Sequence, residues 1–169
     1  AAFRKRGLDI DILSPDTTDF TGYAIVAIPA LFAWNDALRE AIANFEGHLL
    51  IGPRSGSKTQ NFSIPPTLAP DLPSNLLDVK VMRIDSVDPR QETEVHGGGG
   101  AVRHWRERVE TNAEVVIEDA EGWPVLMSQG KLHYLAASGT KALVHRIVAL
   151  LITEANMPTL NLPARVRCR

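Results

Sequence analysis

The sequence has almost no cysteine. Its 169 residues include one, Cys168, so the chain can form no internal disulfide and offers no cysteine-rich metal site. It also lacks a long apolar run: the longest, residues 142–152, is interrupted by His145 and Arg146, well short of the about 20 residues that a membrane-spanning helix requires. No apolar segment of the signal-peptide type follows the basic N-terminus. We therefore expect no membrane contact, and a cytoplasmic location by default.

An excess of basic charge is also missing. The chain has 18 Lys and Arg against 20 Asp and Glu, a net charge of −2, and most of its basic residues are scattered. Nucleic-acid-binding domains usually carry a basic face or stripe, so a nucleic-acid partner is not expected. A content of 44% hydrophobic and 22% charged residues is typical of a globular protein, and the length suits one domain.

A glycine-punctuated basic turn between Gly52 and Thr59 (GPRSGSKT) is the most conspicuous motif. A phosphate-binding P-loop needs four residues between its glycines, a Lys directly after the second one, and a helix that starts there. Here three residues separate Gly52 from Gly56, Ser57 stands before Lys58, and four prolines follow within residues 65–73. Prolines at this density forbid the helix, so nucleotide binding is a weak alternative.

The same turn suits a contact between domains or subunits. Ordered surface loops often carry such contacts, and this one presents Arg54 and Lys58 around Ser55 and Gly56. We predict a domain-contact loop formed by Arg54, Ser55, Gly56 and Lys58.

The first half of the chain has the pattern of a strand–helix–strand unit. Residues 7–14 alternate apolar and acidic side chains, which predicts a strand, and residues 23–28 (YAIVAI) are apolar on both faces, as in a covered parallel strand. Asn35 is a good N-cap for a helix that ends at Gly47, and a short strand follows at residues 48–51. This order predicts parallel α/β architecture.

The second half predicts an antiparallel region and a final helix. Residues 75–84 contain a strand, while residues 85–108 are expected to be the least structured part, with a flexible tip at Gly97 to Gly100. Three short β runs follow with turn-sized spacing, which predicts an antiparallel meander, at residues 113–118, 124–127 and 131–135. Residues 140–156 have a wide apolar stripe at helical spacing.

No catalytic, cofactor or metal site is predicted. Asp9 and Asp11 share one face of the first strand, as glycosidase carboxylates could, but nothing nearby completes a sugar site. The turn at residues 29–34 after the apolar strand holds no Ser, Cys or Thr nucleophile. His96 and His104 have no partner at metal-ligand spacing.

Together these segments resemble the middle domain of the family 42 glycoside hydrolases, the bacterial β-galactosidases. The matching segments are residues 11–15 (DILSP), 22–23 (GY), 28–31 (IPAL), 52–59 (GPRSGSKT), 64–65 (IP), Trp105, 121–124 (EGWP) and 130–135 (GKLHYL). The resemblance implies a flavodoxin-like or class I glutamine-amidotransferase-like fold: a three-layer α/β sandwich with a mostly parallel sheet and a C-terminal antiparallel hairpin. It further implies an assembly domain of a homotrimer that cleaves terminal β-D-galactosides.

In that family the catalytic glutamates belong to a preceding TIM barrel of the same polypeptide. No residue of this chain matches them, so no catalytic residue is transferred and the chain alone is expected to be inactive. The resemblance assigns residues 1–157 to the trimerisation domain and residues 158–169 to a linker toward a truncated β domain. It also implies a strand and a helix before Gly7, with residues 1–6 as the end of that helix. We expect the missing strand to be truncated or supplied by a neighbouring chain.

Two alternatives remain. One is a small enzyme of the amidotransferase-like superfamily, which needs a nucleophile after a core strand, whereas the only cysteine lies in the tail. The other is a nucleotide-binding module that uses the turn from Gly52 to Thr59.

Overall fold

The computed structural model describes residues 2–88 and 90–160, and strands dominate this part of the chain. The helices are α1 (Ala2–Lys5), α2 (Asp36–Asn44) and α3 (Lys141–Glu154). The strands are β1 (Ile25–Ile28), β2 (His48–Ile51), β3 (Val79–Ser86), β4 (Thr93–Glu94), β5 (Ala101–Thr111), β6 (Glu114–Glu118), β7 (Pro124–Gln129), β8 (Leu132–Leu135) and β9 (Ala137–Gly139).

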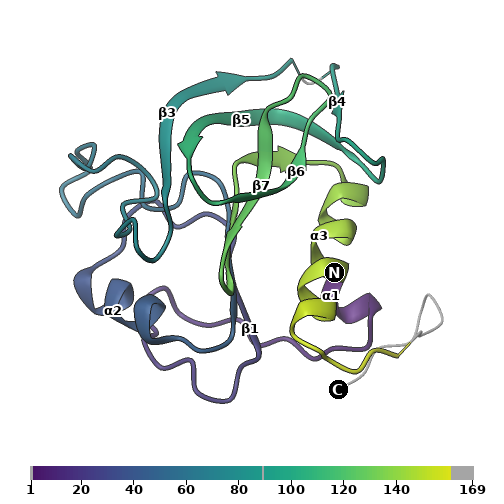
Figure 1. Cartoon of the computed structure of the whole chain (residues 1–169). Helices are drawn as coiled ribbons and strands as arrows, with labels where there is room; N and C mark the ends of the chain where they lie inside the picture. The colour runs from purple at the N-terminus through teal and green to yellow at the C-terminus, as the bar shows by residue number, and fades with distance from the viewer. Residues whose placement is uncertain (1, 89, 161–169) are drawn as a thin grey trace.

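These strands form two sheets. The first has five strands in the order β1-β2-β8-β7-β6, in which β1, β2 and β8 are parallel and β7 and β6 are antiparallel to their neighbours. The second is antiparallel, in the order β3-β5-β4, and β9 also pairs with β5. Figure 1 shows β3 and β5 across the top of the molecule, with α3 to the right and α2 to the lower left.

The prediction of a flavodoxin-like or amidotransferase-like three-layer sandwich is therefore wrong. In the described residues, nine strands accompany three helices, and parallel pairing is confined to β1, β2 and β8. The error lies mainly in residues 85–108, which were expected to be the least structured part. They contain β4 and most of β5, the central strand of the second sheet.

Buried ion pairs explain why the polar strand β5 could be mistaken for a loop. The side chain of Arg106 is only 4% exposed, and its guanidinium lies 2.6 Å from a Glu121 oxygen and 3.3 Å from an Asp119 oxygen. Arg108 pairs with Asp85 of β3 at 2.7 Å. A buried charge is tolerated when it is paired and hydrogen-bonded, and none of these partners is visible from local sequence pattern.

The hydrophobic core lies on both faces of the mixed sheet. On one face, Trp34 and Leu38 pack with Ile51 and Tyr134, and Val79 from the second sheet joins this cluster. On the other face, three of the four α3 residues predicted to form its main apolar stripe are buried near Val102 of β5 and Leu126 of β7, namely Leu143, Ile147 and Leu151. The fourth, Leu150, is partly buried against the same cluster. Helix α1 packs beside α3 through Ala2 (Figure 1).

Several local predictions are confirmed. The predicted N-cap Asn35 caps α2, since its side chain accepts a hydrogen bond from the Leu38 amide at 2.8 Å. Thr140, for which no cap was predicted, caps α3 in the same way through the Leu143 amide. The predicted meander is present as β6, β7 and β8. Helix α2 ends at Asn44, three residues before Gly47. The strand predicted at residues 7–14 is wrong, because that segment has no regular structure.

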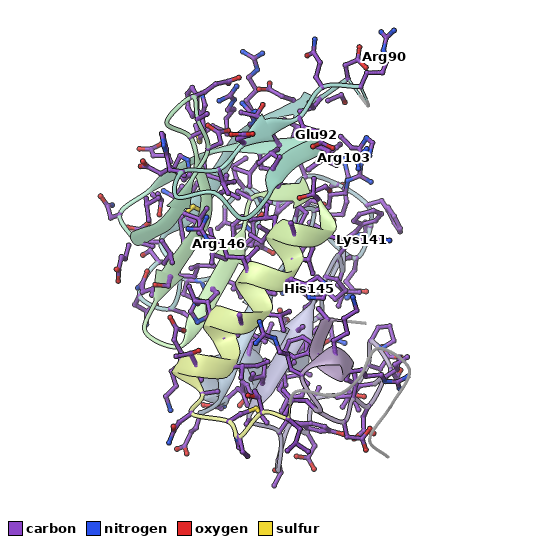
Figure 2. All side chains as sticks on the ribbon, turned by 90° about the vertical axis from the view of Figure 1, so that its right-hand side faces the viewer. Arg90, Glu92, Arg103, Lys141, His145 and Arg146 are labelled. Atoms are coloured by element: carbon purple, nitrogen blue, oxygen red, sulfur yellow. The ribbon has the colours of Figure 1, made fainter. Side chains whose placement is uncertain are left out.

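The glycines from Gly97 to Gly100 connect β4 to β5 and lie against α3. Arg146 projects from α3 (Figure 2) and donates hydrogen bonds to the carbonyls of His96 and Gly98, at 2.9 and 2.5 Å. Gly100 has a φ of 137°, and a Cβ at this position would lie 2.3 Å from the Leu143 nitrogen. The glycine run therefore lets the chain pass close to the first turn of α3.

None of the helices in the described part of the chain is long and apolar enough to cross a membrane.

Candidate domain-contact loop

The predicted contact loop leaves the mixed sheet at the carboxyl end of β2. Three backbone amides hold it beside the segment that follows β1: Gly52 donates to Ile28 at 2.8 Å, Gly56 to Leu31 at 2.9 Å and Lys58 to Phe32 at 2.9 Å. The loop is thus a backbone-bonded extension of the β1–β2 pair, which fixes its position against the sheet.

Ser55 and Gly56 are buried and stabilise this position of the loop. Ser55 is fully buried; its Oγ accepts a hydrogen bond from the Leu31 amide at 3.2 Å and donates to the Ile28 carbonyl at 3.5 Å. Gly56 is buried with a φ of 61°, and a Cβ there would lie 2.0 Å from the Pro70 oxygen. Neither can reach a partner, so they shape the loop rather than contact anything beyond it.

A buried carboxylate, Glu107 of β5, anchors the loop from below. One of its oxygens accepts hydrogen bonds from the Arg54 amide at 2.8 Å and from Trp105 Nε1 at 3.1 Å. The other accepts from the Tyr134 hydroxyl at 2.6 Å. Burial raises the pKa of Glu107 above its ordinary value, although these hydrogen bonds and the Arg54 charge oppose the rise. Burial and the neighbouring Glu107 carboxylate also raise the pKa of Tyr134.

Arg54 and Lys58 are the loop residues that face outward. The Arg54 guanidinium lies over the Trp105 ring, 3.8 Å from its centroid, a cation–π arrangement that restricts the side chain. Arg54 is exposed and Lys58 is half-buried. Within residues 2–88 and 90–160, neither forms an ion pair. A positioned cation without an internal partner is available to an external one.

Exposed apolar side chains lie next to these cations. Phe32, whose carbonyl binds the Lys58 amide, is 44% exposed, while Phe62 and Ile64 are 71% and 66% exposed. A tight turn brings Phe62 back toward the loop, because its amide donates to the Thr59 carbonyl at 2.9 Å. Arg and aromatic residues are enriched in protein interfaces, so this composition favours a protein-contact surface.

Sequence reasoning found the loop but missed Glu107. The residue stands between two arginines in a polar run, which suggests an exposed position. One signal was available: in a strand, Trp105, Glu107 and Val109 share a face, and two large apolar neighbours on that face indicate burial.

The structure also weighs against the alternative sites. No helix begins within residues 57–78, so the turn lacks the helix N-terminus of a P-loop. Asp11 accepts a hydrogen bond from Tyr23 at 2.9 Å, which raises the pKa of Tyr23, and the predicted strand that would place it beside Asp9 does not form. Cys168, the possible nucleophile, lies outside the described residues.

Comparison with known proteins gives a consistent result. Residues 1–158 match the family model described as the β-galactosidase trimerisation domain. A β-galactosidase of Thermus thermophilus is 36% identical over 171 aligned positions, which cover 100% of this chain and 26% of that protein.

Two solved structures share the fold. The crystal structure of β-galactosidase from the psychrophilic Marinomonas ef1 superposes with a TM-score of 0.92 at 34% identity, covering 99% of this chain and 26% of that one. The β-galactosidase from the haloarchaeon Halorubrum lacusprofundi gives a TM-score of 0.86 at 27% identity, with 98% and 27% coverage. The chain thus spans about a quarter of the length of the relatives that it matches.

Proposed function

Because this chain belongs to the β-galactosidase trimerisation domain family of the family 42 glycoside hydrolases, we propose that it is the non-catalytic assembly domain of a longer β-galactosidase. In this proposal the chain holds three identical polypeptides together, and a TIM barrel of the same polypeptide hydrolyses terminal β-D-galactosides in the cytoplasm. The observation that carries the proposal is the family match over residues 1–158, together with the much greater length of the relatives.

The loop after β2 is the surface that we assign to the contact. Its outward cation, Arg54, is held by stacking on Trp105 and by the Glu107 anchor beneath it. A pre-ordered side chain loses less conformational entropy when it binds, and Arg with adjacent aromatic groups is a common hot-spot composition. Arg54 would pair with a carboxylate or a carbonyl of a neighbouring domain or subunit, while Phe32 and Phe62 bury apolar area beside it.

The domain boundaries follow from the same proposal. Residues 1–157 form the assembly domain, and residues 158–169, most of which lie outside the described residues, lead to a following domain. The edge of β1 is a candidate position for the strand that is expected before Gly7. The segment around Ile10 and Ile12 and strand β1 both line an apolar cavity of about 720 Å³, and among the described residues β1 pairs with β2 alone. We propose that a preceding segment of the same polypeptide adds a strand there.

Charge reversal at Arg54 tests the contact surface. In the longer polypeptide, Arg54→Glu should raise the trimer dissociation constant at least about tenfold, as expected for a hot-spot side chain. Sedimentation velocity at several protein concentrations measures this.

The matched control is Arg90→Glu. Arg90 is 89% exposed and lies in the segment between β3 and β4, outside the loop after β2, at the top of Figure 2. An Arg54→Glu protein that sediments like the Arg90→Glu control would contradict the assignment of this loop to the interface.

A further inference from the structure

Three side chains that can ligate a metal ion converge on the face of the mixed sheet that α3 covers. His48 begins β2, His133 lies in β8, and Glu154 is the last residue of α3. In the parallel register, Leu50 pairs with His133. Since residues 48 and 50 point to the same face of the strand, His48 and His133 are diagonal neighbours beneath the end of α3.

The distances suit a single ion. His133 Nε2 lies 3.0 Å and His48 Nδ1 lies 3.6 Å from the same Glu154 oxygen, and one ligand atom from each residue falls within 4.8 Å of the other two. Nitrogen and oxygen ligands 2.0–2.1 Å from a tetrahedral zinc ion are about 3.3 Å apart. The two imidazole rings are close to parallel, with an interplanar angle of 18° and centroids 5.9 Å apart.

Three ring nitrogens of the two histidines have no hydrogen bond of normal geometry within the described residues, although His133 Nε2 lies close to Glu154. His133 is fully buried, and neither of its ring nitrogens is hydrogen-bonded within the described part of the protein; His48 Nδ1 is also unpartnered there. Buried polar atoms are normally satisfied. His133 Nε2 and His48 Nδ1 both lie beside the same Glu154 oxygen, and these two nitrogens indicate a missing ligand at that point.

The charge arrangement also favours a cation. Glu154 lies at the C-terminal end of α3, whose last turn contains no basic residue. A carboxylate there is repelled by the partial negative charge at the helix C-terminus. A bound cation would offset the charge of the carboxylate and the partial charge of the helix end. Burial lowers the pKa of His133, an effect that the His48 charge reinforces and Glu154 opposes.

We propose that His48, His133 and Glu154 bind one divalent transition metal ion of the zinc type. Two imidazoles and a carboxylate are ligands that such ions prefer over magnesium or calcium. Because the Glu154 side chain is 38% exposed, a water molecule can complete the coordination from solvent. The ion would link the end of α3 to β2 and β8. The site is independent of the assembly function, and its residues are too far apart in sequence to form a recognisable motif.

Zinc titration of the untagged 169-residue protein, stripped of metal by chelator, tests the site. Isothermal calorimetry with zinc chloride should give one ion per chain with a dissociation constant in the micromolar range or below, and magnesium chloride should give no binding. At a zinc concentration one hundred times the dissociation constant, Tm should rise by about 5–10 °C, and excess chelator should reverse the rise.

Variants separate this site from adventitious binding. Glu154→Gln and His48→Gln change side chains that are not fully buried, and each should weaken zinc binding at least about tenfold, because loss of even an outer-shell partner has an effect of that size. The matched control is His145→Gln, which removes a histidine from the outer part of α3 (Figure 2) and should leave the affinity unchanged. Absence of saturable zinc binding to the wild type would overturn the proposal, as would wild-type affinity in Glu154→Gln.

Discussion

At the scale of single residues, Glu107 holds the loop after β2 by accepting hydrogen bonds from three parts of the chain. Its donors are the Arg54 amide, the Trp105 indole and the Tyr134 hydroxyl. The carboxylate is buried in an apolar setting, and desolvation is the largest influence on its pKa, which is raised above 4.5.

This shift predicts a pH dependence of stability. A raised pKa means that the folded chain holds the proton more tightly than the unfolded chain. The contribution of Glu107 to the free energy of unfolding is therefore full below pH 4.5 and is lost as the pH rises through the folded pKa. Glu107→Gln removes this titration, so the stability of the wild type relative to the variant should fall as the pH increases from 4.5.

Urea unfolding at a series of pH values measures the difference. Glu110→Gln is the matched control, because it changes an exposed carboxylate on the same strand, and its pH dependence should be smaller. A wild type that gains stability relative to Glu107→Gln with rising pH would contradict the burial argument.

The residues of the candidate contact site were only partly predictable. Arg54 and Lys58 stand out because a basic, glycine-punctuated turn cannot bury its charges by local structure. Glu107 does not stand out in the sequence, because its burial depends on Tyr134 and on a loop 53 positions away. His48, His133 and Glu154 were missed for the same reason: only the sheet register and the docking of α3 bring them together.

At the scale of elements, Gly56 allows the loop to pass beneath Pro70. Its φ of 61° is strained for other residues, and a Cβ would lie 2.0 Å from the Pro70 oxygen. Gly56→Ala should lower the free energy of unfolding by about 1–3 kcal/mol from backbone strain alone, with a further loss from the steric clash.

Gly122→Ala isolates the clash in chemical denaturation experiments. Gly122 has a φ of 81° but no neighbouring atom within 4 Å of the added Cβ. The free energy of unfolding of this variant should therefore fall through backbone strain alone. Equal destabilisation by the two substitutions would show that the loop can move away from Pro70 at no cost.

A second prediction for an element concerns the backbone amides at the outer edge of β1. The Ala24 and Ile28 carbonyls accept hydrogen bonds from His48 and Gly52, so in the alternating pattern of a parallel pair the amides of Ile25 and Ala27 point away from β2. If a preceding segment of the longer polypeptide adds a strand there, these two amides should exchange hydrogen at least about tenfold more slowly in the longer polypeptide than in the 169-residue chain.

Hydrogen exchange read by NMR or mass spectrometry compares the two proteins. The Leu49 amide, which donates to Lys131 inside the sheet, serves as the internal control. Equally fast exchange of Ile25 and Ala27 in both proteins would contradict strand addition at β1.

Elements whose signal is local were predicted well. The cap at Asn35 and the meander from β6 to β8 depend on neighbouring residues, and both are present. Residues 7–14 alternate like a strand, but a strand forms only with a partner, and the described residues provide none at that position. Strand β5 is the opposite case: its sequence does not look like a strand, but the strand forms because its charged side chains pair with distant segments.

At the scale of the whole molecule, the fold class was wrong although most strands were right. A strand–helix–strand start predicts a parallel sheet, and β1, β2 and β8 do form one. The antiparallel sheet of β3, β5 and β4 depends on pairings between residues up to 32 positions apart, which periodicity does not encode. The family resemblance therefore identified the family more reliably than the architecture.

The mass of the longer polypeptide in solution tests the central claim most directly. Size-exclusion chromatography with multi-angle light scattering, at micromolar concentration and moderate salt, should give one species with three times the polypeptide mass. A species with the mass of a single polypeptide at every concentration would contradict the assignment of this chain as an assembly domain.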